Sequence, residues 1–377
     1  MNCKLSILPL VLAALGASTA AHAAAPRPVT DCPLRNEPFS AASPVIDILL
    51  SEPAKAVVEG VVPGRLSKLP PIFIGTRTPT FAALLDVHAL AGMIGMTPDQ
   101  VAQIDAGLRK LPVTPADKLA RCARYDNEQP PFTVAKGRRN ILFFDKINGF
   151  YHAEAVPAAR EAIRQLAARK GWSVAFTGKG GSITPATLRK FDAVVWSNVS
   201  GDVLTLSQRK ALENYVTGGG GFVAVHGSGG DSYYSWPWYA DTLIGARFIG
   251  HPMNPQFQDA RVVVEDRAHP IAAGLPAEWT MSDEWYSFKD SPRQSGANVV
   301  LTLDEKTYKP VGMANQDLRM GSDHPLAWSK CVGKGRAFYS AIGHRAESYA
   351  QPQNVQLLES ALEWAANRKQ ACRTKPR

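Results

Sequence analysis

The second part of the chain alternates short apolar runs with amphipathic stretches, and this alternation limits the possible folds more than any other feature. Residues 140–144 form an apolar run, and residues 155–169 then place apolar side chains on one face at helical spacing. Further strands are predicted at residues 172–176, 191–196 and 221–225, and a further helix at residues 207–217. Strands that alternate with helices are typical of a parallel sheet with right-handed crossovers. The sequence therefore predicts an α/β domain over residues 138–367.

Residues 26–135 follow a different pattern, in which prolines separate short stretches of helical spacing. Thr97 followed by Pro98 is typical of a helix start, and apolar residues then recur at helical spacing up to Leu111. We expect a small all-α domain of about four helices here. A proline-containing linker at residues 128–131 would join it to the α/β domain. At roughly 100–200 residues per domain, the 377 residues have room for both.

Residues 1–23 have the pattern of a secretory signal peptide. Lys4 supplies a positive charge, residues 5–15 are a short apolar run, and Ala21-His22-Ala23 matches a small-residue cleavage site. The apolar run is too short to span a bilayer, and no later stretch is long enough. The sequence thus predicts an exported protein, periplasmic or secreted, without membrane insertion.

The cysteines and the charge support an extracellular setting. Removal of the predicted signal peptide leaves four cysteines, Cys32, Cys122, Cys331 and Cys372. An even number in an exported protein suggests two disulfides, and three pairings are open. We favour Cys32–Cys122 and Cys331–Cys372, because each pair would close one predicted domain on itself. The net charge of +9 is spread out, apart from a basic tail at residues 368–377, so we expect no nucleic-acid partner.

Three histidines follow predicted strands. His152 comes after the first strand, His226 comes directly after the fourth, and His344 comes after a further predicted strand at residues 336–341. In an open α/β sheet, ligands bind outside the carboxyl ends of the strands, which meet at one edge. We therefore expect these three imidazoles to share one rim of the sheet.

Two more candidates lie between these positions in the sequence. His251 follows another apolar segment and precedes a proline, which favours an extended backbone. Glu284 lies in the run Asp283-Glu284-Trp285-Tyr286, which combines carboxylates with aromatic rings. We expect His251 and Glu284 to join the histidines at the rim.

A series of short motifs accompanies these residues in a fixed order. They are Gly149-Phe150-Tyr151-His152, residues 218–226, Gly250-His251-Pro252, His269-Pro270-Ile271 with Gly274-Leu275-Pro276, Asp283-Glu284-Trp285-Tyr286, His324-Pro325-Leu326-Ala327-Trp328 and residues 333–344. In these motifs the chain resembles the ThuA-like (trehalose utilisation) family, a relative of the class I glutamine amidotransferases, over about residues 138–367. The resemblance implies a flavodoxin-like, doubly wound and mostly parallel sheet. It also implies a role in carbohydrate metabolism, with oxidised (keto) sugars as substrates.

The chain departs from the amidotransferases at one decisive position. Those enzymes place a nucleophilic cysteine directly after the strand where this chain has His226. No cysteine occurs between Cys122 and Cys331. The sequence therefore predicts no glutamine amidotransferase activity.

The residues that we assign to catalysis are His226, Glu284, His344 and His152. Glu284 is the best acid or base among them. Burial against Trp285 and Tyr286 would raise the pKa of its carboxyl toward the pH at which an enzyme works. The reaction expected at this rim is hydrolysis of a sugar or glycoside, or proton transfer next to a sugar carbonyl.

The site has two alternative chemistries and a separate set of binding residues. A divalent metal held by His226, His251 and His344 could polarise a carbonyl or activate water. Otherwise histidine and carboxylate would act directly as base and acid. The residues assigned to substrate binding, mainly for aromatic stacking, are Tyr151, Asp283, Trp285, Tyr286 and Trp236.

Two other functions stay open at this stage. One is a non-catalytic sugar-binding module on an amidotransferase-like scaffold. The other is a serine hydrolase, because residues 226–230 approximate the G-x-S-x-G elbow with Ser228 as nucleophile. In either case the expected ligand is a small carbohydrate, and the oligomeric state is left open.

Overall fold

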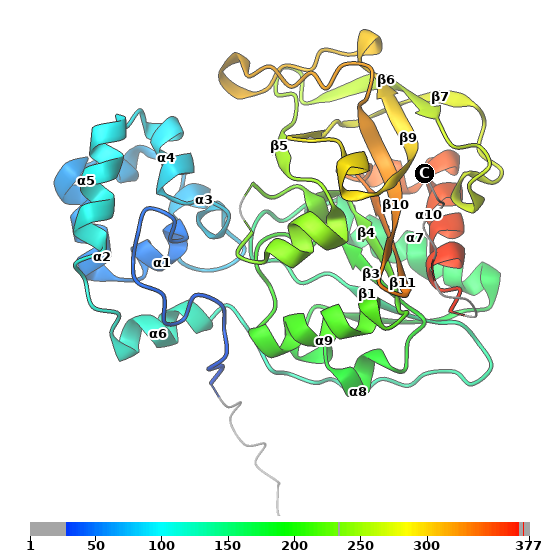
Figure 1. Ribbon diagram of the computed structural model, residues 1–377, viewed down its shortest axis with the longest axis horizontal. Helices are drawn as coiled ribbons and strands as arrows, with labels where there is room; N and C mark the ends of the chain where they lie inside the picture. The colour runs from blue at the N-terminus through cyan, green and yellow to red at the C-terminus, as the bar shows by residue number, and fades with distance from the viewer. Residues whose placement is uncertain (1–27, 233, 369–371, 373–377) are drawn as a thin grey trace, which may run out of the picture.

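The computed structural model describes residues 28–232, 234–368 and 372. The predicted signal peptide lies outside the described residues, as do positions 369–371 and 373–377 of the predicted basic tail. A helical part formed by the first third of the chain lies beside a larger part with a central sheet (Figure 1).

The central sheet has nine strands and two halves of different direction. The strands are β1 (Asn140–Phe144), β2 (Ser173–Thr177), β3 (Ala193–Ser197), β4 (Gly221–Val225), β6 (Phe257–Val264), β7 (Glu278–Glu284), β9 (Asn298–Asp304), β10 (Pro325–Val332) and β11 (Gly335–Ser340). Their order is β2-β1-β3-β4-β11-β10-β9-β6-β7. Two short strands, β5 (Phe248–Gly250) and β8 (Ser287–Phe288), pair separately.

The first half of the sheet, β2-β1-β3-β4-β11, is parallel, as predicted. Strands β3 and β4 are buried along their whole length, which explains their unbroken apolar sequences. The helices that connect and cover these strands are α7 (Ala155–Lys170), α8 (Pro185–Leu188), α9 (Leu206–Thr217) and α10 (Pro352–Ala365). Since β1 to β2 and β3 to β4 run in opposite directions across the sheet, right-handed crossovers place α7 and α9 on opposite faces.

The second half differs from the expectation of a mostly parallel sheet. From β11 onward the neighbours β10, β9, β6 and β7 pair antiparallel, so the sheet as a whole is mixed. Strand β6 alternates buried and exposed residues, as expected for a strand with one covered face. This half brings the end of β7, and with it Glu284, toward the loops that follow β4 and β11.

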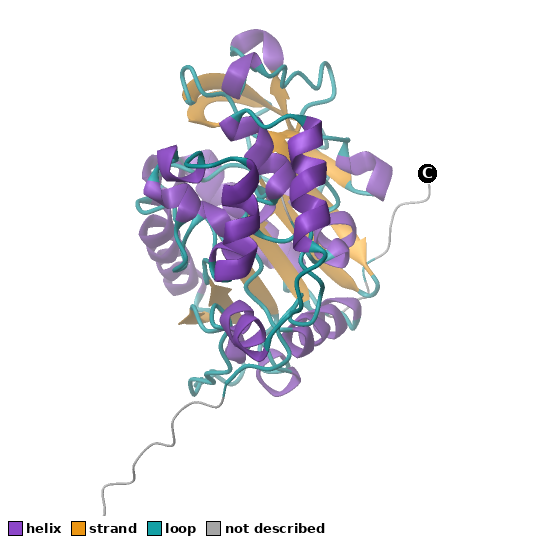
Figure 2. Cartoon of the chain, turned by 90° about the vertical axis from the view of Figure 1, so that its left-hand side faces the viewer, coloured by secondary structure: helices purple, strands orange, loops and turns teal. Residues whose placement is uncertain are grey.

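The described part of the N-terminal region contains helices and no strand. The α-helices are α1 (Val45–Leu49), α2 (Glu52–Val61), α3 (Pro71–Ile74), α4 (Val87–Ile94), α5 (Pro98–Leu108) and α6 (Pro115–Cys122). Thr97 caps α5 with a reciprocal bond from Gln100, as the sequence indicated. The apolar stretch at residues 44–58 forms two helices, because Pro53 occupies the first turn of α2, where its missing N–H does no harm. In Figure 2 these helices lie in front of the sheet.

Both favoured disulfides are present. Cys32 bonds to Cys122, and Cys331 bonds to Cys372. The first joins the segment before α1 to the end of α6, and the second fixes Cys372 beside the β10–β11 hairpin. Within the described ranges, no helix has the length and apolar character needed to cross a bilayer.

Candidate active site

A cavity of about 450 Å³ lies at the carboxyl ends of the parallel strands. Phe150 and His152 reach it from the loop after β1, Ser200 from the loop after β3, and His344 from the loop after β11. The strand order reverses between β1 and β3, and ligands of open α/β sheets bind at such a point. The predicted site residues that line this cavity are His152, His251, Glu284, Tyr286 and His344.

His226 lies just beneath the floor of the cavity and is fully buried. It directly follows β4 with φ +44°, a left-handed conformation that is uncommon outside glycine. Its Nδ1 lies 2.6 Å from the carbonyl oxygen of Ala341, so Nδ1 carries the proton and Nε2 is the acceptor. The hydroxyl of Tyr286 donates to Nε2 at 2.9 Å.

Glu284 ends β7 and is the shared partner of the histidines. Its Oε2 lies 3.0 Å from His344 Nδ1 and 3.5 Å from His226 Nε2. Its Oε1 lies 3.2 Å from His251 Nδ1 and accepts a hydrogen bond from Gln256. The carboxylate is 2 % exposed, so imidazoles and an amide stand in place of water around it.

The expected raised pKa of Glu284 is wrong. Burial does raise the pKa of this carboxyl, but its close contacts with His226 and His344 and the charge of His251 outweigh burial and hold the pKa well below its usual range. Aromatic neighbours alone do not decide this pKa, because three imidazoles also contact the carboxylate. Glu284 is therefore ionised, which is the form of the carboxyl that can accept a proton.

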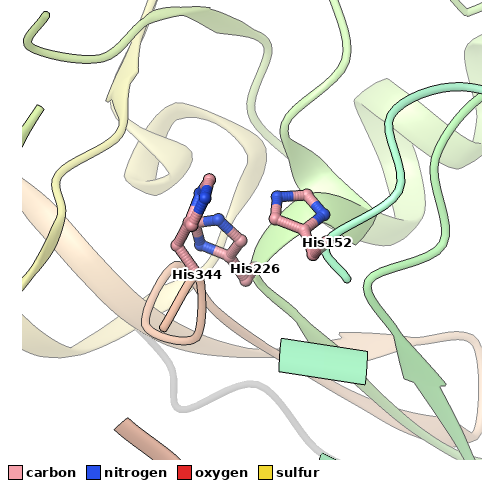
Figure 3. Close-up of side chains that lie close together, drawn as sticks. All are labelled: His152, His226 and His344. Carbon is pink, nitrogen blue, oxygen red and sulfur yellow. The ribbon is translucent and has the colours of Figure 1, made fainter. Parts of the chain in front are cut away.

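Three histidines, two bordering the cavity and His226 beneath it, form a compact group (Figure 3). Ligand nitrogens of His152, His226 and His344 all lie within 4.8 Å of one another. Their ring centroids are 4.6 to 5.2 Å apart. Burial and the nearby charges of His226 and His344 lower the pKa of His152 well below its usual value, so this ring is neutral. The metal set predicted from the sequence needs correction, since His152 rather than His251 completes the group.

Asp283 is a positioning residue and not a substrate contact. It is fully buried, and its carboxylate accepts hydrogen bonds from the backbone N–H groups of Gly343 and His344 and from the hydroxyl of Ser348. These bonds join the end of β7 to the loop after β11. They hold His344 beside Glu284, which the sequence alone did not indicate.

Most of the rings predicted to stack on a sugar lie elsewhere. Trp285 is fully buried and donates its indole N–H to the carbonyl of Gln258. Trp236 packs against Trp238 and Tyr239, away from the histidines. Tyr151 is exposed but does not line the cavity. Tyr286 alone of these aromatic residues borders it, and burial raises the pKa of its hydroxyl well above the usual value, so the phenol keeps its proton.

Ser228 is not placed as a nucleophile. Its hydroxyl donates to the carbonyl of Trp196 at 2.7 Å and accepts from the backbone N–H of Val199. It is fully buried and does not border the cavity. The serine-hydrolase alternative is therefore wrong in its placement of Ser228.

Sequence reasoning missed an apolar wall that comes from the N-terminal region. Phe73, Phe81 and Leu84 line the same cavity as the histidines. Their sequence pattern marks them only as core residues of short helices, so no local signal pointed to the site. Gln256, which donates a hydrogen bond to Glu284, was also missed, because no local sequence signal pointed to the site.

The fold and the site define an α/β protein with a histidine-rich cavity at the carboxyl edge of a mixed sheet. The family model for ThuA, described as trehalose utilisation, matches residues 140–365. The chain belongs to this family. No match was found among curated proteins.

Three solved structures show what the chain is similar to. A putative ThuA-like protein from Bacteroides uniformis is 25% identical, with a TM-score of 0.53, over 63% of this chain and 95% of that one. A putative ThuA-like protein from Parabacteroides merdae is 18% identical, with a TM-score of 0.46, over 64% and 94%. A β-galactosidase from Rahnella sp. R3 is 15% identical, with a TM-score of 0.38, over 72% of this chain and 34% of that one.

Proposed function

We propose that this protein is an exported enzyme that acts on a small carbohydrate, a keto-sugar or glycoside, by proton transfer or hydrolysis in the histidine-rich cavity. The observation that carries the proposal is the buried, ionised Glu284 in contact with three imidazoles at the cavity floor. Ionisable groups with strongly shifted pKa values gather at active sites. The family description, trehalose utilisation, supports a sugar as the substrate. The two disulfides support an oxidising compartment.

The geometry suits removal of a proton next to a carbonyl. Glu284 Oε2 would accept the C–H proton, because the carboxylate is ionised and little hydrated. Imidazole groups of His152 and His344, which border the cavity, would stabilise the developing charge on the carbonyl oxygen. With a glycoside, the same carboxylate would activate a water molecule.

Solvent deuterium exchange tests this proposal directly. The mature protein is incubated in D₂O with a keto-disaccharide, and NMR follows exchange of the proton beside the carbonyl and release of free sugar. We expect Glu284→Gln to lower the rate by about 10²- to 10⁴-fold, since general-base catalysis contributes this much.

The chain offers a matched control for this substitution. Glu305 also contacts a buried histidine, His324, with Oε1 2.7 Å from Nδ1, but it does not border the cavity. Glu305→Gln should leave the rate unchanged. Sugar binding without exchange or release in the wild type would contradict an enzyme and favour a non-catalytic binding module.

A further inference from the structure

We propose that His152, His226 and His344 bind one divalent transition-metal ion, with Zn²⁺ as the expected ion. Their ligand nitrogens lie within 4.8 Å of one another. Nitrogens around one tetrahedral zinc are roughly 3.3 Å apart, given Zn–N bonds of about 2.0–2.1 Å. The rings therefore need to close by about 1.5 Å at most. Neutral imidazole is the commonest metal ligand in proteins.

The surroundings of His226 are those of a metal ligand. A ligating histidine almost always donates its second ring N–H to a carbonyl or carboxylate, which fixes the ring and its tautomer. The 2.6 Å bond from His226 Nδ1 to the Ala341 carbonyl does this and leaves Nε2 with its lone pair. That lone pair accepts the Tyr286 hydroxyl, so an ion at Nε2 would replace this hydrogen bond.

His152 supplies an independent observation. Its ring is 5 % exposed and borders the cavity, yet its Nδ1 has no hydrogen-bond partner. Buried polar atoms are nearly always paired, and the capacity to bind an ion is one explanation for an exception. The position of His344, the third member, is fixed by the bond from its backbone N–H to Asp283.

Three histidine ligands would leave a tetrahedral ion one coordination position for water or substrate. Three protein ligands with an open fourth position are typical of catalytic zinc. Glu284 Oε2 lies 3.0 Å from His344 Nδ1 and 3.5 Å from His226 Nε2, so a carboxylate oxygen lies beside two of the histidines that would hold the ion. There it could accept a proton from a bound water, which would leave a hydroxide on the ion. This inference shares residues with the proposed function, but metal binding is measured without turnover.

The test is metal analysis of the untagged mature protein, followed by titration of the metal-free protein with ZnCl₂ and CoCl₂. We expect one ion per chain and, with Co²⁺, the intense visible absorption of a tetrahedral site. His152→Ala should weaken Zn²⁺ binding by about 100-fold or more, a loss at least as large as that for residues that only hydrogen-bond to a ligand. His251→Ala should leave the Zn²⁺ affinity nearly unchanged. The same is expected of His88→Ala, because His88 lies on the exposed surface of α4.

Two further variants guard against misfolding. His226→Gln keeps a polar group in a fully buried position, and its circular dichroism reports whether it folds. Tyr286→Phe removes the hydroxyl that competes for Nε2, so it should retain or tighten Zn²⁺ binding. The proposal is overturned if the folded wild type binds neither Zn²⁺ nor Co²⁺ stoichiometrically, or if His152→Ala binds Zn²⁺ as tightly as the wild type. If the wild type binds the metal but does not turn over the sugar, the result would contradict the proposed function and not the metal site.

Discussion

Asp231 shows how strongly single residues near the cavity depend on their surroundings. Its carboxyl is buried and accepts hydrogen bonds from the hydroxyl of Ser200 at 2.7 Å and the backbone N–H of Gly201 at 2.5 Å. Burial outweighs these bonds and raises the pKa of Asp231 from 3.8 to about 7. Between these pH values the folded protein holds a proton that the unfolded chain releases. The stability contributed by this proton is present below about pH 4 and is lost as the pH rises toward 7.

Asp231→Asn should remove this pH dependence. Relative to wild type, the free energy of unfolding of the variant should rise between about pH 4 and pH 7, with about 4 kcal/mol as the upper limit at 1.36 kcal/mol per pKa unit. Loss of the Gly201 bond adds an offset that does not depend on pH. Urea unfolding of both proteins across this range measures the difference. A constant difference between the two curves would show that Asp231 titrates normally in the fold.

The positions of site residues could be predicted from the sequence where the pairing of the strands fixes them. His226 and Ala341 follow paired residues of parallel strands, Val225 and Ser340, so the topology alone brings them together. Burial of Trp285 and Trp236 could not be predicted, because an aromatic residue has the same sequence signal in a core and in a sugar site. The low pKa of Glu284 was missed because three of its neighbours come from distant segments.

At the scale of elements, the turn after β4 depends on closely packed glycines. The 3-10 helix η4 (His226–Gly229) and Gly230 lie against aromatic rings. A Cβ at Gly227 would lie 2.8 Å from His152 Cε1, and one at Gly230 would lie 2.5 Å from the Tyr286 ring. Both distances are too short for real side chains. The glycines thus allow His152 and Tyr286 to approach the turn that carries His226.

Gly230→Ala should displace Tyr286 and destabilise the fold. Overpacking of this kind costs about 1–3 kcal/mol, so the melting temperature should fall, and the Tyr286–His226 hydrogen bond should be lost. Gly60→Ala in α2 is the matched control, because no atom lies within 4 Å of its added Cβ. It should be neutral or stabilise the protein by up to about 1 kcal/mol. Equal melting temperatures for the two variants would contradict the steric argument.

Element types were predictable in the parallel half of the sheet and not in the antiparallel half. Strands β1 and β4 have the predicted bounds, since fully buried strands give unbroken apolar runs. Strand β6 has only alternating burial, and its pairing with β7 and β9 depends on tertiary contacts. The spacing of apolar residues along a strand does not identify its neighbours or whether they run parallel or antiparallel. The mixed sheet could therefore not be predicted.

At the scale of the whole molecule, the disulfides restrict the unfolded chain. Cys32 and Cys122 are 90 residues apart, and Cys331 and Cys372 are 41 apart. In the chain-entropy model, a disulfide stabilises more as the loop that it closes lengthens. The Cys32–Cys122 bond also lies in a small cluster with Val29 and Tyr125, apart from the main core.

Replacing both Cys32 and Cys122 with alanine should lower the free energy of unfolding by about 2–5 kcal/mol. The Cys331→Ala, Cys372→Ala pair should cost about 0.7 kcal/mol less, from the logarithm of the loop lengths. Urea unfolding without reductant measures both losses. An equal or larger loss for the shorter loop would mean that native packing, and not the unfolded chain, decides the effect.

The N-terminal region lies outside the family match, yet it completes the cavity and supports the loop that carries His152. The backbone N–H of Thr80 donates to the carbonyl of Asn148, and Phe81 packs against Phe150 with ring centroids 5.2 Å apart. Leu84 lies so close to Gly149 that a Cβ there would be 2.4 Å from Leu84 Cδ2. These contacts couple the apolar wall to the histidine-bearing floor of the cavity.

Truncation of this wall should therefore affect substrate binding more than chemistry. Phe81→Ala removes a cavity-lining ring and its contact with Phe150. KM for the keto-disaccharide should therefore rise about 10-fold, which is the effect of one lost apolar contact, while kcat should change less. Leu119→Ala, on the exposed surface of α6, is the control and should change neither constant. Steady-state kinetics of the wild type and the two variants measure both constants. A fall in kcat with unchanged KM would instead place Phe81 among the residues that position His152 for the reaction, because uniform binding energy affects KM and transition-state alignment affects kcat.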